Sequence, residues 1–363
     1  MFPAIAVGEE LERRGWLVSY TGTATGMEAR IAASRGLDFH ALEATAVRGR
    51  GPLERAAAFL ILLRSTARAR RLVRRLDARA VVATGGYACV PAALGAYLCC
   101  RPIVLVEPNA TAGLANRALS RVAAAAAVAW PAAARALSCP ARETGVPVRR
   151  EFVTQSAELP PGPPWRLLVL GGSQGATTLN RLVPEALRCL RSAPAAPAGA
   201  GSGIAAAIEV LHQAGRGKED ATRALYAACG VRAEVTPFLD DVPAAMAASH
   251  LVLSRAGAVT LAEICAAGRP ALLFPLALAA GHQLENARAL ERAGAAEVVE
   301  AGPPEPGPEA AAAAVDAQAL AARLGRLLER PRLESMAAAA RALARPGAAA
   351  AIADLVEETV SGR

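Results

Sequence analysis

Residues 254–275 read SRAGAVTLAEICAAGRPALLFP, and this stretch decides the fold. The apolar residues 251–253 before it predict a buried strand, Gly257 predicts a tight turn, and a helix follows until Gly268 stops it. Residues 271–274 then predict a second buried strand. A helix that opens on a glycine turn leaves its first backbone N–H groups unpaired, and these groups suit a phosphate. Ordinary strand-to-helix turns share the pattern, so by itself it leaves both interpretations open.

Two further glycine turns follow predicted strands. Residues 166–170 run into GGSQGA at 171–176 and then into a helix, which again indicates an anion-binding turn. Residues 81–82 run into Gly85, Gly86 and Tyr87, where the glycines let backbone approach a ligand closely. Strand and helix patterns alternate through both halves of the 363-residue chain. The sequence therefore predicts the α/β class, with two Rossmann-like domains that face each other across a cleft.

Composition narrows the function. The seven cysteines are scattered without a CxxC pair, so we expect no metal site and free thiols. No apolar run reaches the length of a membrane span. Residues 1–150 hold 21 Arg against 10 acidic residues, a net charge of +11, whereas residues 151–363 carry a net charge of −3. An acidic partner would therefore meet the first half of the chain, and nucleic acid or an anionic membrane are the two candidates.

A basic helix predicted within residues 48–79 bears on that choice, since it carries ten arginines. A helical projection places Phe59, Leu62, Leu63, Thr66, Ala69, Val73 and Leu76 on one face, with the arginines opposite. Apolar residues beside arginines suit a membrane interface, although a solvated basic face is the alternative. Nucleic acid is disfavoured, because no aromatic residues are interleaved with the arginines. The candidate membrane residues are Phe59, Leu60, Ile61, Arg64 and Arg68.

The order and spacing of these strings resemble the MurG glycosyltransferases, which transfer N-acetylglucosamine from UDP to a lipid-linked acceptor in peptidoglycan synthesis. The match rests on SRAGAVTLAE and GGSQGA, and on four weaker strings. These are GGYAC at 85–89 for the family's GGYxS, EPN at 107–109 for EQN, GVPVR at 145–149 for GNPVR, and GHQLENA at 281–287 for DHQxxNA. Cys89, Val146 and Gly281 depart from the family's Ser, Asn and Asp.

The resemblance implies a GT-B fold and a division of labour between the domains. Residues 1–155 would form the acceptor- and membrane-binding domain, residues 156–345 the UDP-sugar-binding domain, and residues 346–363 a helix that returns to the first domain. Residues 159–165 (LPPGPPW), rich in Pro and Gly, read as a linker. The acceptor site would include Gly85, Gly86 and Tyr87. No cofactor and no metal are implied.

The resemblance also implies which residues bind the donor. Glu263 would take the ribose hydroxyls, the backbone of Leu239 would hold the uracil, and Asn109 would lie near the transferred sugar. Asn109 is also a plausible helix cap, and Arg149 a plausible hinge salt-bridge residue, so these alternatives stay open. The full predicted donor set is Asn109, Arg149, Ser173, Gln174, Leu239, Ala258, Val259, Thr260, Leu261, Ala262, Glu263 and Gln283.

The start of the chain leaves the catalytic base unassigned. In the family a GGTGGH-x-FP string precedes the first helix, and this sequence begins at the last three positions, Met1, Phe2 and Pro3. The family's candidate base, a histidine, would precede Met1. We expect the true start to lie upstream of Met1; the alternative is a chain that lacks its first central strand and glycine loop.

The resemblance implies an inverting transferase that moves N-acetylglucosamine from UDP-GlcNAc to the C4 hydroxyl of undecaprenyl-diphospho-N-acetylmuramoyl-pentapeptide. It would act as a peripheral protein on the cytoplasmic face of the bacterial cell membrane, with cell-wall synthesis proteins as further partners. The alternatives are another GT-B enzyme, such as a lipid glycosyltransferase or a UDP-sugar epimerase, and a non-catalytic protein that binds UDP-sugar or membrane.

Overall fold

The fold was obtained as a computed structural model of the whole chain. It describes residues 1–45, 52–155, 157–172, 175–192, 207–276, 282–300 and 316–362. The chain divides into two compact units. Met1–Arg149 and Arg345–Arg363 form the first unit, and Arg150–Ala344 form the second.

The described part of the first unit contains two parallel sheets, β1-β2 and β3-β4-β5-β6, with helices around them. Its elements in chain order are α1 (Phe2–Arg13), β1 (Tyr20–Gly22), α2 (Met27–Arg35), β2 (Phe39–Ala41), α3 (Pro52–Arg75), β3 (Val81–Ala83), the 3₁₀ turn η1 (Tyr87–Cys89), α4 (Val90–Tyr97), β4 (Ile103–Glu107), α5 (Leu114–Leu119), β5 (Ala125–Val128), α6 (Pro131–Ala134), β6 (Ala141–Glu143) and α15 (Ala348–Ser361).

Strand β4 shows why this sequence forms a sheet covered on both faces. All five residues of IVLVE are buried, as expected for a parallel strand with helices on both sides. Because side chains alternate along a strand, Val104 and Val106 pack in one cluster with residues of α1 and α15. Ile103 and Leu105 pack in another cluster with residues of α4. Each face of the sheet therefore has its own apolar core.

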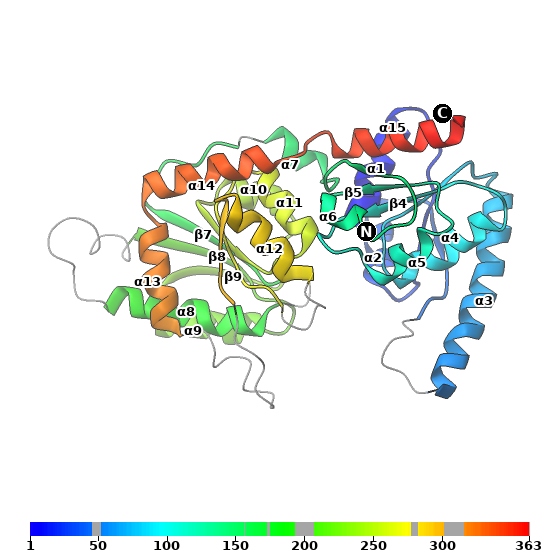
Figure 1. The fold of residues 1–363 in the computed structure, drawn as a ribbon. Helices are drawn as coiled ribbons and strands as arrows, with labels where there is room; N and C mark the ends of the chain where they lie inside the picture. The colour runs from blue at the N-terminus through cyan, green and yellow to red at the C-terminus, as the bar shows by residue number, and fades with distance from the viewer. Residues whose placement is uncertain are drawn as a thin grey trace. The chain divides into compact units, whose positions relative to one another are not determined.

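Helix α15 closes the first unit, and Figure 1 shows it in red beside α1 in blue. Its Ile352 and Val356 join the same apolar cluster as Val7 and Leu11 of α1. The Arg14 guanidinium pairs with Asp354 at 2.7 Å and with Glu357 at 2.8 Å, and the Trp16 indole N–H also donates to Glu357. The two ends of the chain are thereby joined within one unit.

The second unit contains one six-stranded parallel sheet of order β12-β11-β10-β7-β8-β9 among the residues that are described. Its elements are α7 (Arg150–Thr154), β7 (Trp165–Leu170), α8 (Thr177–Ser192), β8 (Ile208–Gln213), α9 (Glu219–Ala228), β9 (Arg232–Thr236), α10 (Val242–Ala247), β10 (Leu251–Ser254), α11 (Ala258–Ala266), β11 (Ala271–Leu273), α12 (His282–Arg292), β12 (Ala296–Val298), α13 (Ala317–Leu327) and α14 (Arg330–Leu343).

The apolar residues of β7 and β10 form the centre of this unit. Leu167, Val169 and Leu253 pack in one cluster with Leu179 of α8 and Leu324 of α13. Helices α8 and α13 also pack against each other, as Figure 1 shows in green and orange. The strands and helices predicted for residues 251–274 are confirmed: β10, α11 and β11 follow one another as expected, and Gly268 ends the helix with a φ of +62°.

One sequence-based expectation about the connections is wrong. Residues 159–165 were expected to be a linker, but they lie inside the second unit. Their backbone is tied down, since Arg330 donates to the carbonyl oxygen of Pro160 at 2.7 Å and Trp165 begins β7.

Candidate active site

The loops that carry the predicted donor residues leave the second sheet at one edge. In the register of the sheet, Leu170 at the end of β7 lies beside Ser254 of β10 and beside Gln213 of β8. The turn that begins at Gly171 and the turn that begins at Arg255 therefore emerge from neighbouring strands. In open parallel sheets, ligands bind at the carboxyl ends of the strands, where these turns lie.

The turn after β7 depends on its glycines. Gly172 and Gly175 have φ values of +80° and +69°. Residues that carry a side chain rarely adopt such positive φ values. A Cβ atom on Gly175 would lie 2.0 Å from the carbonyl oxygen of Ala214. The predicted donor residues Ser173 and Gln174 lie outside the described residues, so their roles stay predictions.

Helix α11 begins at the edge of the sheet with an open N-terminus. Gly257 precedes it in an extended conformation, and within the described part of the chain no side chain caps its first N–H groups. Ala258, Val259 and Thr260 form its first turn, which could present backbone N–H groups to a phosphate. Glu263 lies one turn further along and is only 6% exposed, as is appropriate for a carboxylate that has a fixed orientation.

Leu239 and Gln283, two further predicted donor residues of this unit, follow β9 and β11 of the same sheet. Leu239 is buried in the loop after β9, next to the exposed Phe238. Gln283 lies in the first turn of α12, and its Oε1 accepts a hydrogen bond from the backbone N–H of Leu276 at 3.0 Å. That bond orients the amide so that its NH₂ group is directed away from Leu276. Strands β7, β9, β10 and β11 thus each lead into part of the predicted set.

Sequence reasoning missed three residues near these turns. Arg255 is half-buried directly after β10, two residues before Gly257, and burial lowers the pKa of its guanidinium. Gln213 donates from Nε2 to the carbonyl oxygen of Gly172 at 3.0 Å, and the buried Asn180 donates to the carbonyl oxygen of Ala214 at 2.9 Å. Arg255 and Gln213 lie at strand ends and Asn180 lies in the first turn of a helix, and these positions could have indicated them from the sequence.

In the first unit, a buried carboxylate organises the predicted acceptor turn and Asn109. Glu107 at the end of β4 accepts from the backbone and side-chain nitrogens of Asn109, at 3.0 and 2.9 Å, and from Asn116 at 2.9 Å. Asn116 in turn lies under Gly85, where a Cβ atom would be 3.2 Å from its Nδ2. Glu107 and Asn116, which sequence reasoning did not select, therefore link Asn109 to the glycine turn.

The acceptor turn itself has the geometry that the glycines predict. Gly85 and Gly86 have φ values of +85° and +77°, and Tyr87 is 52% exposed. Cys89, which replaces the family's serine, still donates a hydrogen bond from its thiol to the carbonyl oxygen of Gly86 at 3.2 Å. Burial raises the pKa of this thiol to about 11, so it stays protonated and keeps that donor.

Arg149 closes the first unit beside helix α1. It is buried, and its guanidinium carbon lies 4.6 Å from the centroid of the Phe2 ring, a cation–π contact. This contact fixes the side chain at the loop that follows β6. Its predicted contact with the nucleotide stays a prediction.

The basic helix α3 exposes apolar residues, but not with the face that the projection predicted. Phe59, Leu60 and Leu63 are 58%, 54% and 51% exposed, whereas Ile61 is half-buried. The buried face is made of small residues instead: Ala58, Ser65, Thr66, Ala69 and Val73. Close packing explains this, because a Cβ atom on Gly95 of α4 would lie 2.8 Å from Ala69. The face grouped by the projection is therefore divided, with Thr66, Ala69 and Val73 buried and Phe59 and Leu63 exposed.

Arg64 and Arg68 are exposed beside these apolar residues, and Arg68 pairs with Glu43 at 2.6 Å. The described helices include none that combines the length and the apolar character needed to cross a bilayer.

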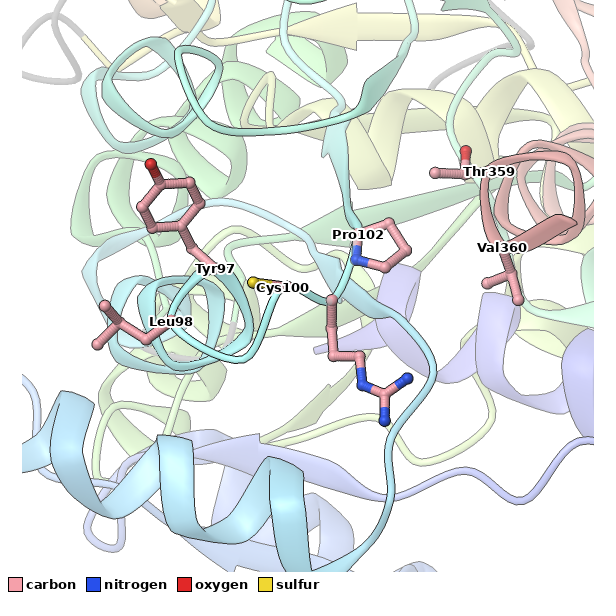
Figure 2. A pocket seen from close by; sticks show the side chains of 7 residues that line it. Tyr97, Leu98, Cys100, Pro102, Thr359 and Val360 are labelled. Atoms are coloured by element: carbon pink, nitrogen blue, oxygen red, sulfur yellow. The ribbon is translucent and has the colours of Figure 1, made fainter. Parts of the chain in front are cut away.

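A cavity of about 630 Å³ lies elsewhere in the first unit. Figure 2 shows Tyr97, Leu98 and Cys100 on one side of it and Thr359 and Val360 of α15 on the other. Pro102, which also lines it, directly precedes β4, so the cavity lies at the amino end of that strand. Because the predicted site residues follow the carboxyl ends of strands, this cavity is not the candidate active site.

Comparison with known proteins identifies the class of this fold and site. Residues 1–128 match the glycosyltransferase family 28 N-terminal domain, and residues 166–305 match the glycosyltransferase family 28 C-terminal domain. The chain is therefore a glycosyltransferase with two Rossmann-like domains, which confirms the predicted fold class.

Its relatives define the family more narrowly. The chain is 42% identical to the UDP-N-acetylglucosamine–N-acetylmuramyl-(pentapeptide) pyrophosphoryl-undecaprenol N-acetylglucosamine transferase of Sorangium cellulosum, over 98% of this chain and 85% of the relative. It is 40% identical to the transferase of the same name from Pseudomonas fluorescens, over 100% and 96% of the two chains. The crystal structure of Acinetobacter baumannii MurG superposes with a TM-score of 0.73 at 30% identity, covering 98% and 95%. The chain belongs to the MurG family, as its motifs predicted.

Proposed function

We propose that the chain transfers N-acetylglucosamine from UDP-GlcNAc to the C4 hydroxyl of the N-acetylmuramoyl residue of undecaprenyl-diphospho-muramoyl-pentapeptide, a step of peptidoglycan synthesis. The observation that carries this proposal is the pair of glycine turns after β7 and β10, which leave adjacent parallel strands. Relatives that carry the name of this reaction match almost the whole chain.

The second unit supplies what the donor needs. Backbone N–H groups at the start of α11 would bind the diphosphate, and the Glu263 carboxylate would accept hydrogen bonds from the ribose. Leu239 and Gln283 would hold the uracil and the sugar hydroxyls. In the first unit, Asn109 and the turn of Gly85, Gly86 and Tyr87 would meet the sugar and the acceptor.

The reaction exchanges one bond at the anomeric carbon. The acceptor oxygen bonds to C1 as the bond from C1 to the β-phosphate oxygen breaks, and UDP leaves with that electron pair. A base takes the proton of the hydroxyl, and groups of positive character stabilise the departing diphosphate. The N-terminus of α11 and the half-buried Arg255 have the required positive character.

Transfer assays with purified chain test this proposal against its alternatives. With radiolabelled UDP-GlcNAc and a lipid-linked muramoyl-pentapeptide, we expect labelled disaccharide-lipid, and we expect none when diacylglycerol replaces that acceptor. Conversion of UDP-GlcNAc to its 2-epimer without acceptor would instead indicate an epimerase. Binding of UDP-GlcNAc with no turnover of either kind would indicate a binding protein.

We also propose that α3 places the first unit on an anionic membrane surface, so that the lipid-linked acceptor is within reach. Phe59, Leu60 and Leu63 offer apolar surface, and Arg64 and Arg68 lie among them. Each arginine near an anionic surface contributes about 1 kcal/mol to binding. This arrangement suits a peripheral protein on the cytoplasmic face of the cell membrane. An interaction with other cell-wall synthesis proteins is a further expectation.

A further inference from the structure

We propose that a buried hydrogen-bonded chain, Tyr226–His212–Asn180, acts together with Gln213 to hold Gly172 and Gly175, the described ends of the glycine turn after β7, in the positions at which that turn binds the donor diphosphate. These four are positioning residues, since all are buried: Gln213 bonds to the turn itself, and the other three act through the Ala214 carbonyl beside it. The inference rests on the proposed donor site in the second unit.

The chain of hydrogen bonds joins three elements. His212 of β8 is fully buried, and its Nδ1 lies 2.8 Å from the hydroxyl oxygen of Tyr226 on α9. Its Nε2 lies 3.0 Å from Oδ1 of Asn180 on α8. Asn180 then donates from Nδ2 to the carbonyl oxygen of Ala214 at 2.9 Å. Ala214 is the residue that directly follows β8.

Only one arrangement of protons satisfies this chain. A carbonyl oxygen only accepts, so the Asn180 NH₂ faces Ala214 and its Oδ1 faces His212. His212 must therefore donate from Nε2, and its Nδ1 accepts from the Tyr226 hydroxyl. Burial lowers the pKa of His212 to about 4 and raises that of Tyr226, so both stay neutral near pH 7. The fixed tautomer gives the Asn180 amide a fixed orientation.

The end of this chain touches the glycine turn. The Ala214 carbonyl that Asn180 orients is the atom against which Gly175 packs, because a Cβ atom there would be 2.0 Å away. Gly172 is held from the other side, since its carbonyl oxygen accepts from Gln213 Nε2 at 3.0 Å and from the Gly175 N–H at 2.9 Å. Gln213 thus holds Gly172 directly, and Asn180 holds the Ala214 carbonyl that lies beside Gly175.

Packing alone does not account for a polar chain at this place. Burying these groups is costly unless each is hydrogen-bonded, and apolar residues could fill the same volume. The second unit offers a comparison in His250, which is also fully buried with a pKa lowered by burial. His250 accepts from the Arg166 backbone N–H at 2.9 Å, at the amino end of the sheet and away from the turns.

The test compares UDP with uridine, which lacks the diphosphate. We expect Asn180→Leu and His212→Leu to raise the Kd for UDP about tenfold, measured by calorimetry on the full chain. The Kd for uridine, measured by NMR titration, should change less than twofold. His250→Leu is the matched control: it should lower the melting temperature similarly while leaving the ratio of the two dissociation constants unchanged.

Three results would decide against the inference. The ratio of the Kd for UDP to the Kd for uridine could stay at the wild-type value in folded Asn180→Leu, or that ratio could rise equally in His250→Leu. If the first two variants fail to fold, Gln213→Leu, which removes a single bond to the turn, must still raise that ratio. Wild-type chain that fails to bind UDP at all would overturn the proposed function itself, a result distinct from loss of the variant effect.

Discussion

Replacing Gly175 by alanine tests the glycine turn with a magnitude that the structure supplies. An alanine in the left-handed region costs about 1–2 kcal/mol. Its Cβ would also lie 2.0 Å from the Ala214 carbonyl oxygen, where real contacts are at least 3.0 Å, so the turn must move by about 1 Å. Such overpacking costs roughly 1–3 kcal/mol more, and a displacement of about 1 Å at a binding turn can weaken function about a hundredfold.

The assay is UDP binding by calorimetry, together with unfolding in urea. We expect Gly175→Ala to lose about 2–5 kcal/mol of stability and to bind UDP tens of times to about a hundred times more weakly. Gly230→Ala is the matched control, since Gly230 has a φ of +64° and its nearest contact is 3.6 Å away in the Arg191 side chain. Gly230→Ala should lose only the roughly 1–2 kcal/mol of stability that alanine costs in the left-handed region, and it should keep its UDP affinity. Equal UDP affinity in the two variants would refute the reasoning.

Three further predictions concern the ribose contact, the membrane surface and pH. Glu263→Gln removes a charge-assisted hydrogen bond worth about 1.5–3 kcal/mol, so the KM for UDP-GlcNAc should rise at least tenfold in the transfer assay; an unchanged KM would remove Glu263 from the site. The triple change of Phe59, Leu60 and Leu63 to Ser should lower sedimentation with phosphatidylglycerol vesicles at least tenfold, whereas Leu225→Ser, an exposed leucine of the second unit, should not; equal sedimentation would contradict the membrane role of α3. The pKa of His212 is lowered from 6.5 to about 4 by burial, so the unfolded chain binds the extra proton first. The contribution of neutral His212 to the free energy of unfolding is fully present above pH 6.5 and decreases by up to about 3 kcal/mol as the pH drops to 4. In urea unfolding, the free energy of unfolding of His212→Leu should therefore decrease less than that of the wild type over this pH range.

The sequence specified the strands and turns of the second unit well, because buried parallel strands are continuous apolar runs and their glycine turns are unmistakable. Leu251–Ser254 and Ala271–Leu273 were predicted almost to the residue. The order of the strands brings the carboxyl ends of β7 and β10 together, and only the topology could show that Ser254 lies beside Leu170.

Side-chain networks were beyond the reach of pattern reasoning. Nothing in the spacing of Asn180, His212 and Tyr226 indicates that they meet, since they lie on two helices and a strand. Helix α3 shows the reverse difficulty. A projection groups residues by angle alone, so it placed Ala69 with Phe59 and Leu63, but the close approach of Gly95 buries only Ala69 of these three.

A crystal structure of the chain with UDP-GlcNAc tests the central claim most directly. We expect the diphosphate within about 2.7–3.2 Å of backbone N–H groups in the turn after β7 and at the start of α11, with the ribose hydroxyls on the Glu263 carboxylate. A nucleotide bound away from the carboxyl ends of β7 and β10, such as in the cavity beside Tyr97 and Val360, would contradict the account.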